Sequence, residues 1–428
     1  MNGKNHFWIN AKIYLYAVVK WLGAAAVTGL LCGLIGTLFH VGVERVTELR
    51  MTHPWLLYLL PLLGIAVVGS YKLCRVEGVG TDSILEEVHS GRGVSLTLLP
   101  AIFFSTVLTH LGGGSVGREG AALQMGGAIG YQSARLFHMD ESDKRTTTTV
   151  GMAAFFSALF GTPMAATVFA MEITNVGRVY YAQMFPCLVA ALTAYGVSLL
   201  LGVEPTAFAV SVPELEPVML LRVTLLAVLC AYLSVLFCET IHAAGKLAAK
   251  RLPNPWLRAV LGGCVIVLLT LLLGTTDYNG AGMPIISAAV TRGQAQPAAF
   301  VCKLIFTAVT LAAGFKGGEV VPSFFVGATF GCVAGPLLGI PSGFAAAVGL
   351  VAVFCGAVNC PLASTFLALE LFGSQGLIYF AMACTLSFVF SGYSGIYSSQ
   401  RILYDKLKAQ YINVQTNHHY TGTEKESL

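Results

Sequence analysis

The chain has 428 residues, of which 56% are hydrophobic and only 11% are charged. Soluble domains carry about a quarter charged residues, so this composition excludes an ordinary soluble protein and indicates a chain that lies mostly in a lipid bilayer. The net charge is +4, and the basic residues are spread between apolar segments instead of being clustered. This spread argues against nucleic-acid binding.

Apolar stretches close to the length that spans a membrane, about 20 residues, recur from Ile13 to Phe390. The polar end of the chain is too short for a separate domain, and His418 and His419 there suit a solvated tail better than a metal site. We predict no metal site and no cofactor. The predicted segments are an interfacial or cytoplasmic segment (1–12), a first membrane repeat (13–205), a second membrane repeat (206–404) and a short, disordered cytoplasmic tail (405–428).

Glycine-rich interruptions break the apolar segments at residues 78–81, 112–115 and 314–318. Backbone freed from a helix inside a membrane survives only where it is buried in protein or lines an aqueous cavity. Helix-forming runs follow the interruptions, from Ser83, at 120–134 and at 320–334. Helix starts expose free N–H groups and the positive end of the helix dipole, so three of them aimed at one point predict an anion site.

Glu119 stands at one of these helix starts, in the run Gly117-Arg118-Glu119-Gly120. A carboxylate is itself an anion, so it can occupy the anion site when ionised and leave it when protonated. Ionisable residues at membrane depth are costly and usually functional, and Glu119 is therefore predicted to be a proton-sensitive gate. The alternative is a structural ion pair with Arg118.

Three further glutamates stand at the ends of apolar helices. Glu319 begins the helix that follows the third interruption, which makes it a candidate second proton group, although a plain salt bridge with Lys316 is equally open. Glu172 and Glu370 end apolar runs, and for them we favour a structural capping or pairing role.

Two stretches of the chain repeat each other. Residues 156–165 match 354–363 in their small residues and proline, and both runs continue to a glutamate, Glu172 or Glu370. Glu119 and Glu319 are each followed, eight residues later, by Gly-Ala. Internal repeats in a membrane protein are typical of transporters and channels, with the substrate site at the repeat interface.

An enzyme or a receptor on a membrane scaffold is the alternative class. Gly112, Gly114 and Gly117 match a dinucleotide-binding fingerprint, but their apolar flanks have transmembrane length and no alternation of strands and helices surrounds them. The chain contains no HExxH, Walker lysine loop or GxSxG motif. The motifs therefore favour transport.

Residues 69–404 resemble the CLC family of chloride channels and proton-coupled anion antiporters, most specifically in the run 112–120 followed by Gln124 and the glycines at 126–127. The resemblance implies an all-α polytopic membrane protein with two inverted-topology repeats of tilted and broken helices, assembled as a homodimer. It implies that Glu119 is the gate. The anion-binding residues that it implies are Gly78, Val79, Gly80, Gly117, Arg118, Gly120, Val320, Val321 and Tyr397. For Tyr397 the alternative is an interfacial aromatic residue beside Arg401.

Four positions depart from the chloride-transporting pattern. Val79 stands where the chloride type has serine, Ala121 replaces a proline, Ile173 replaces the internal proton glutamate, and Glu319 replaces an apolar residue. These departures resemble the fluoride-exporting branch of the family. We therefore predict fluoride–proton exchange in a bacterial inner membrane, with fluoride, protons, lipid and a second copy of the chain as partners. The alternative is a chloride–proton antiporter or a passive chloride channel.

Overall fold

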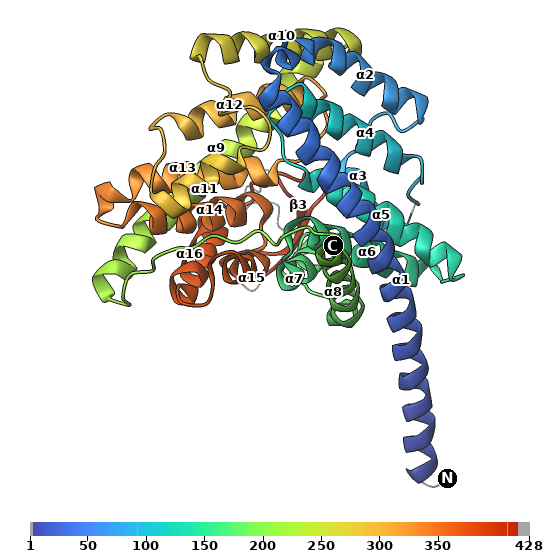
Figure 1. The fold of residues 1–428 in the computed structure, drawn as a ribbon. Helices are drawn as coiled ribbons and strands as arrows, with labels where there is room; N and C mark the ends of the chain where they lie inside the picture. Colours follow the sequence, from blue (N-terminus) through green and yellow to red (C-terminus); the bar gives the residue numbers. More distant parts are fainter. Residues whose placement is uncertain (1–2, 92, 409, 418–428) are drawn as a thin grey trace.

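The computed structural model describes residues 3–91, 93–408 and 410–417, so His418 and His419 lie outside the described residues. The chain is mostly helical (Figure 1). The first half contains α1 (Gly3–Thr52), α2 (Leu60–Leu73), α3 (Thr81–Ser90), α4 (Leu98–Leu111), α5 (Glu119–Leu136), α6 (Glu141–Phe160), α7 (Pro163–Glu172) and α8 (Met184–Leu200). The second half contains α9 (Pro217–Arg251), α10 (Pro255–Leu273), α11 (Met283–Arg292), α12 (Ala299–Ala312), α13 (Val320–Ala334), α14 (Ser342–Val358), α15 (Pro361–Phe372) and α16 (Leu377–Phe390). Short 3₁₀ helices lie at Pro54–Leu59, Tyr181–Gln183 and Pro336–Leu338.

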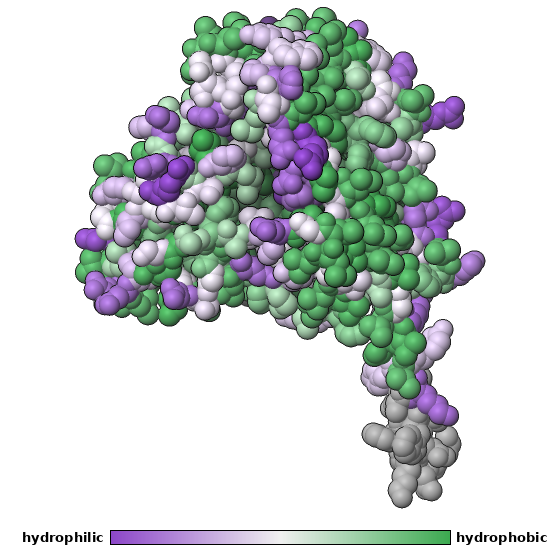
Figure 2. Space-filling view, in the orientation of Figure 1, coloured by the Kyte–Doolittle hydropathy of each residue, from purple (hydrophilic) through white to green (hydrophobic). Residues whose placement is uncertain are grey.

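Within the described residues, five helical segments are long and apolar enough to cross a membrane. Many of the other apolar helices have only 10–17 residues, which is short for a full crossing. Hydrophobic side chains cover much of the visible face (Figure 2), and Leu73 and Leu200 are more than four-fifths exposed. Such a surface suits lipid and not water. The five segments are Tyr14–Thr52, Pro54–Leu73, Tyr181–Leu200, Pro217–Arg251 and Pro255–Leu273.

The first helix begins before the first candidate span. That span starts at Tyr14, close to the predicted Ile13, whereas α1 begins at Gly3 and its amino-terminal part projects beyond the body (Figure 1). A salt bridge between Lys20 and Asp143 joins α1 to the start of α6. The predicted interfacial segment 1–12 is therefore mostly a continuation of this helix.

The expectation of an all-α fold is wrong in one respect. β1 (Asn175–Val176) pairs in parallel with β2 (Arg401–Tyr404), and β2 pairs antiparallel with β3 (Tyr411–Gln415). The prediction of disorder after Tyr404 is wrong for β3. Its physical basis is backbone pairing with β2, whose Ile402 is fully buried. The Tyr393 hydroxyl and the Leu407 amide donate to the Asp405 carboxyl in the hairpin turn and hold its pKa below the ordinary value.

Glycine contacts bring the central helices unusually close. A β-carbon on Gly126 of α5 would lie 2.3 Å from the carbonyl oxygen of Gly151 in α6, and a β-carbon on Gly327 of α13 would lie 2.3 Å from that of Gly349 in α14. Small residues at such crossings let the backbones approach, as is common in membrane helix packing. The two helix pairs fix α5 and α13, whose first residues form the site described next.

Candidate anion and proton site

The three predicted helix starts lie where the sequence indicates. α3 begins at Thr81, α5 at Glu119 and α13 at Val320, each directly after a glycine-rich interruption. A fourth interruption, missed in the sequence, precedes α11, where Gly280 and Gly282 have positive φ angles of 61° and 82°. Its glycine spacing in Gly280-Ala281-Gly282 matches that of 78–80, which was the available signal.

The starts of α5 and α13 are joined through their preceding loops. Gly117 donates its N–H to the carbonyl oxygen of Gly318 at 2.7 Å, and Gly318 donates to that of Gly117 at 2.8 Å. The two residues form an antiparallel bridge between segments about 200 positions apart. The bridge holds both helix starts at one point.

Glu119 reaches from the start of α5 to the start of α13. The residue is fully buried, and its Oε2 accepts a hydrogen bond from the Val321 amide at 3.2 Å. Its Oε1 is buried and has no hydrogen-bond partner among the described residues. The expected alternative, an ion pair with Arg118, does not form, because Arg118 Nη2 instead donates to the Leu159 carbonyl at 3.4 Å.

Glycines leave just enough room for this carboxylate. A β-carbon on Gly117 would lie 2.1 Å from Glu119 Oε2, and one on Gly318 would lie 2.9 Å from the same atom. A β-carbon on Gly120 would lie 2.9 Å from the carbonyl oxygen of Gly317. The glycines on both sides of Arg-Glu are therefore required by the packing of the carboxylate and of the opposite loop.

The first interruption adjoins the same point through α3. The Thr81 hydroxyl donates to the Gly120 carbonyl at 3.5 Å, and Gln124 Nε2 donates to the Thr81 oxygen at 3.2 Å. A β-carbon on Gly78 or Gly80 would meet no atom within 4 Å, so open space lies beside this loop. Val79 is half-buried there and carries no hydroxyl.

Tyr397 is buried, and its hydroxyl has no hydrogen-bond partner among the described residues. Its ring is 2% exposed, so the alternative of an interfacial aromatic residue is wrong. Its loop is tied to α3, because the Ser399 amide donates to Asp82 Oδ1 at 2.9 Å. Asp82 and Ser399 were missed in the sequence, where nothing connects two residues so far apart.

Glu319 is the N-cap residue of α13, where its side chain makes no capping hydrogen bond and its buried Oε2 has no partner among the described residues. The expected match to Glu119 is off by one residue, because the N-cap of α5 is Arg118 and Glu119 is the first residue of that helix. The alternative of a direct salt bridge with Lys316 is not found among the described residues, and the Lys316 ammonium lies 4.2 Å from the centre of the Tyr71 ring. A cation over an aromatic face is stabilised by the ring quadrupole. Lys316 therefore acts on Glu319 as a nearby charge and not through a salt-bridge contact.

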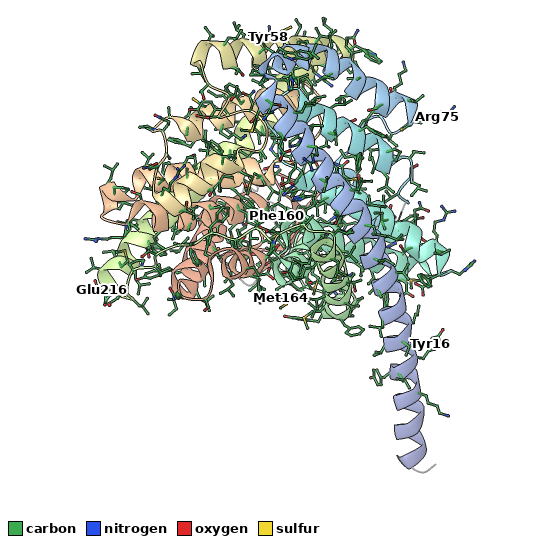
Figure 3. All side chains as sticks on the ribbon, viewed as in Figure 1. Tyr16, Tyr58, Arg75, Phe160, Met164 and Glu216 are labelled. Carbon is green, nitrogen blue, oxygen red and sulfur yellow. The ribbon has the colours of Figure 1, made fainter. Side chains whose placement is uncertain are left out.

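A cavity of about 460 Å³ reaches Glu119 and Val321. Arg118 and Phe160 line it, and Phe160 lies near the centre of the body (Figure 3). Arg50 and His110, both missed in the sequence, line it as well. His110 stands two residues before Gly112, the start of the glycine-rich run, and that position was the available signal.

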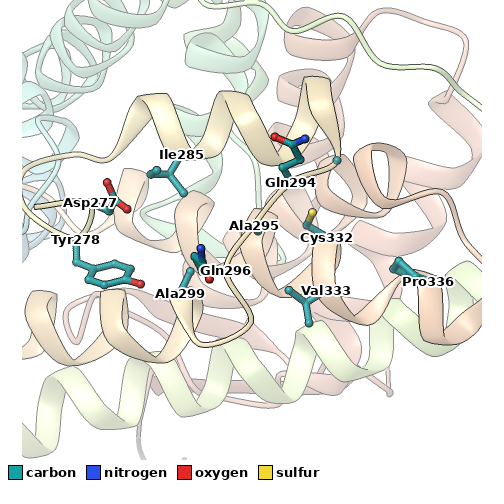
Figure 4. Close-up of a pocket in the computed structure, with 11 residues that line it drawn as sticks. Asp277, Tyr278, Ile285, Gln294, Ala295, Gln296, Ala299, Cys332, Val333 and Pro336 are labelled. Carbon is teal, nitrogen blue, oxygen red and sulfur yellow. The ribbon is translucent and has the colours of Figure 1, made fainter. Parts of the chain in front are cut away.

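A second cavity, of about 530 Å³, lies beside α11 and α13 (Figure 4). Gln294, Gln296 and Cys332 line it, and it contains none of the predicted site residues. Asp277 lines both cavities. The first cavity is the one that gives access to the buried carboxylate.

Glu172 and Glu370 cap each other's helices. Glu172 ends α7 and accepts hydrogen bonds from the Leu362 and Ala363 amides at 3.3 and 2.9 Å, at the start of α15. Glu370, in α15, accepts from Met164 and Ala165 at 2.9 and 2.8 Å, at the start of α7. This reciprocal capping is the structural role that the sequence favoured for both.

The fold and the site together define a polytopic membrane transport protein, with broken helices that converge on a buried carboxylate beside a cavity. Residues 70–392 match the family described as voltage-gated chloride channel. The chain belongs to this CLC family of transporters and channels, and it is not an enzyme.

Several relatives share most of the chain. A "Chloride/fluoride channel protein" from Pseudomonas syringae pv. tomato is 38% identical over 91% of this chain and 88% of its own length. An "H(+)/Cl(-) exchange transporter ClcA" from Vibrio vulnificus is 27% identical over 93% of each chain. The crystal structure of a CLC-type fluoride/proton antiporter has a TM-score of 0.87 and 31% identity, covering 90% of this chain and 98% of that one.

Proposed function

We propose that the chain exchanges fluoride for protons across a bacterial inner membrane, with Glu119 as the protonatable gate. The observation that carries the proposal is the position of the Glu119 carboxylate. Glu119 is the first residue of α5, and its carboxylate accepts a hydrogen bond from the Val321 amide of α13. A carboxylate in this place uses the N–H groups that an anion would use. The gate and the transported anion therefore compete for one position.

Protonation couples the two ions. Ionised Glu119 holds the position and keeps it closed to other anions. A proton neutralises the carboxylate, weakens its charge-assisted bond with Val321 and lets the side chain leave. An anion then takes its place at the starts of α5 and α13, and Glu119 returns when the proton departs on the other side. Inward movement of protons thus drives outward movement of the anion.

Fluoride is favoured as the anion by the two similar proteins whose names include it. The residues agree with this choice. Val79 gives the first loop no hydroxyl, and Ile173 stands where chloride antiporters have a glutamate. Fluoride is small and strongly hydrated, so a tight ring of N–H and hydroxyl donors can replace its water better than a wide pocket can.

Glu319 is proposed as the second proton group. It lies at the N-cap of α13, one residue before the position that matches Glu119 in α5, and its Oε2 has no hydrogen-bond partner in the described part of the structure. A buried carboxyl that makes no salt bridge is stabilised by protonation, so it can receive and release protons near the gate.

We further propose that the two halves are inverted repeats and that the protein is a homodimer, as the family resemblance implies. Two observations support the repeats. Gly117 and Gly318, at corresponding positions of the halves, bond to each other reciprocally, and so do the α7 and α15 caps formed by Glu172 and Glu370. Reciprocal contacts between corresponding positions are what a two-fold axis produces.

The test is transport by the purified protein in liposomes, with fluoride and pH recorded together. We expect fluoride release to drive proton uptake, with chloride almost unmoved. Equal chloride flux would favour the chloride–proton antiporter, and anion flux without proton movement would favour a passive channel. Glu119→Gln should remove proton coupling, whereas Glu204→Gln, an exposed loop control, should preserve it. Normal coupling in Glu119→Gln rules out the gate.

A further inference from the structure

The loop that carries Tyr397 is bonded to the carboxyl-terminal hairpin. The Thr416 hydroxyl, at the end of β3, donates to the Tyr397 carbonyl oxygen at 2.5 Å, and the Thr416 amide donates to that of Gln400 at 3.0 Å. Asn417 Oδ1 accepts from the Gly395 amide at 3.0 Å, and Asn417 Nδ2 donates to the Gly395 carbonyl at 2.9 Å. The hairpin therefore bonds to the backbone on both sides of the tyrosine.

A lysine of the hairpin turn acts on the same loop through Asn359. Lys406 Nζ donates to Asn359 Oδ1 at 2.5 Å and to the Phe388 carbonyl at 2.8 Å. An ammonium has only donors, so it fixes which end of the amide faces it. The other end, Asn359 Nδ2, donates to the Ser394 carbonyl at 2.9 Å and to Gln400 Oε1 at 3.1 Å.

The loop that carries Tyr397 has no regular secondary structure of its own that would fix the position of this residue. The chain between α16 and β2 forms turns without a helix or strand. The Tyr397 hydroxyl has no partner among the described residues, so no hydrogen bond of its own holds the ring. Thr416 bonds to the backbone carbonyl oxygen of Tyr397 itself. This bond therefore fixes the backbone from which the tyrosine side chain extends.

We propose that the hairpin of β2 and β3 positions the Tyr397 hydroxyl against the transported anion, with Thr416, Asn417 and Lys406 as positioning residues. The inference rests on the proposed function and on the role as an anion donor that the family resemblance implies for this hydroxyl. Short hydrogen bonds to a small anion lose strength steeply with distance. A shift of the loop should therefore weaken fluoride binding before it affects the rest of the transport cycle.

The test uses the full-length protein in liposomes. Thr416→Val keeps the side-chain shape and removes the hydroxyl, and we expect it to raise the KM for fluoride by about 3-fold to 10-fold. The maximal rate should stay within about 2-fold of the original, as in a loss of binding alone. Thr416→Ser keeps the donor and should restore the KM. Thr148→Val is the matched control, because the buried Thr148 hydroxyl bonds only within its own helix, to the Lys144 carbonyl.

The same substitution in a Tyr397→Phe background separates positioning from general stability. If the hairpin acts through the tyrosine hydroxyl, Thr416→Val adds no further rise in KM once that hydroxyl is gone. If the rise in KM caused by Thr416→Val multiplies with the rise caused by Tyr397→Phe in the double variant, the inference is overturned. An unchanged KM in the Thr416→Val protein overturns it as well. Asn417→Ala, with the same expectations, replaces Thr416→Val if the latter does not fold.

Failure of the proposed function has a different signature. A wild-type protein that moves no fluoride against protons refutes the exchange itself. A Tyr397→Phe protein with a normal KM removes the tyrosine from the anion site, and with it the hairpin's role. When Tyr397→Phe is impaired but Thr416→Val acts independently of it, only the hairpin inference fails.

Discussion

One methyl group at Gly117 should displace the Glu119 carboxylate. A β-carbon there would lie 2.1 Å from Oε2, 2.8 Å from Cδ and 2.9 Å from Oε1 of Glu119, and these are its three nearest atoms. Gly117 does not have a positive φ angle, so its backbone accepts alanine. The overlapping atoms are the far end of a flexible side chain, and we expect that side chain to move and the backbone to stay.

The size of the effect follows from what the carboxylate gives up. It loses the hydrogen bond from the Val321 amide, which is 3.2 Å long and buried. Hydrogen bonds to charged groups contribute about 1.5–3 kcal/mol. That range corresponds to about a 10-fold to 150-fold lower occupancy of the gate position.

We therefore expect Gly117→Ala to move fluoride faster than the original protein and with fewer protons for each fluoride. The measurement is simultaneous fluoride and proton flux from liposomes. Gly196→Ala is the matched control, since a β-carbon there meets no atom within 4 Å. In a Glu119→Ala background the methyl group no longer meets a carboxylate, and Gly117→Ala should then change nothing. A folded Gly117→Ala protein with the original rate and coupling refutes the steric argument.

Three other substitutions address the remaining parts of the site. Glu319→Gln should reduce proton flux while fluoride flux continues, and unchanged proton flux in the liposome assay would remove Glu319 from the proton path. Val79→Ser adds a hydroxyl beside the open space of the first loop and should raise the ratio of chloride to fluoride flux, so an unaltered ratio would contradict its role in selectivity. Glu370→Gln removes the charge that caps α7. This should cost about 1 kcal/mol of stability and lower the unfolding temperature in detergent. An equal fall in unfolding temperature in the exposed control Glu204→Gln would contradict the capping.

The helix starts of the site could be predicted because each has a local signal. Glycines break the apolar runs at 78–80, 112–117 and 314–318, and a helix begins within a few residues after each. The position of Glu119 at such a start follows from the same signal. The hydrogen-bond partner of Glu119 could not be predicted from that signal, because Val321 lies 202 positions further along the chain. Local patterns fix where helices begin, and packing decides which starts meet.

The carboxyl-terminal hairpin shows why composition alone misled. The run after Tyr404 is polar and short, which favours disorder. β3 forms because the edge of β2 offers backbone partners, and because Thr416 and Asn417 find donors and acceptors in the Tyr397 loop. Those partners exist only once α14 and α16 have packed, so no local pattern could reveal them.

The site departs from two-fold symmetry in a way that bears on coupling. Glu119 is the first residue of α5, whereas Glu319 is the N-cap of α13 and so holds the position that Arg118 holds before α5. Only Glu119 accepts a hydrogen bond from the opposite helix start, and Glu319 Oε2 has no partner among the described residues. Two ionised carboxylates at these neighbouring helix starts would repel each other. We infer that one carboxylate holds the anion position while the other stays protonated, so that a proton moving between them would open the gate without leaving two charges at the axis.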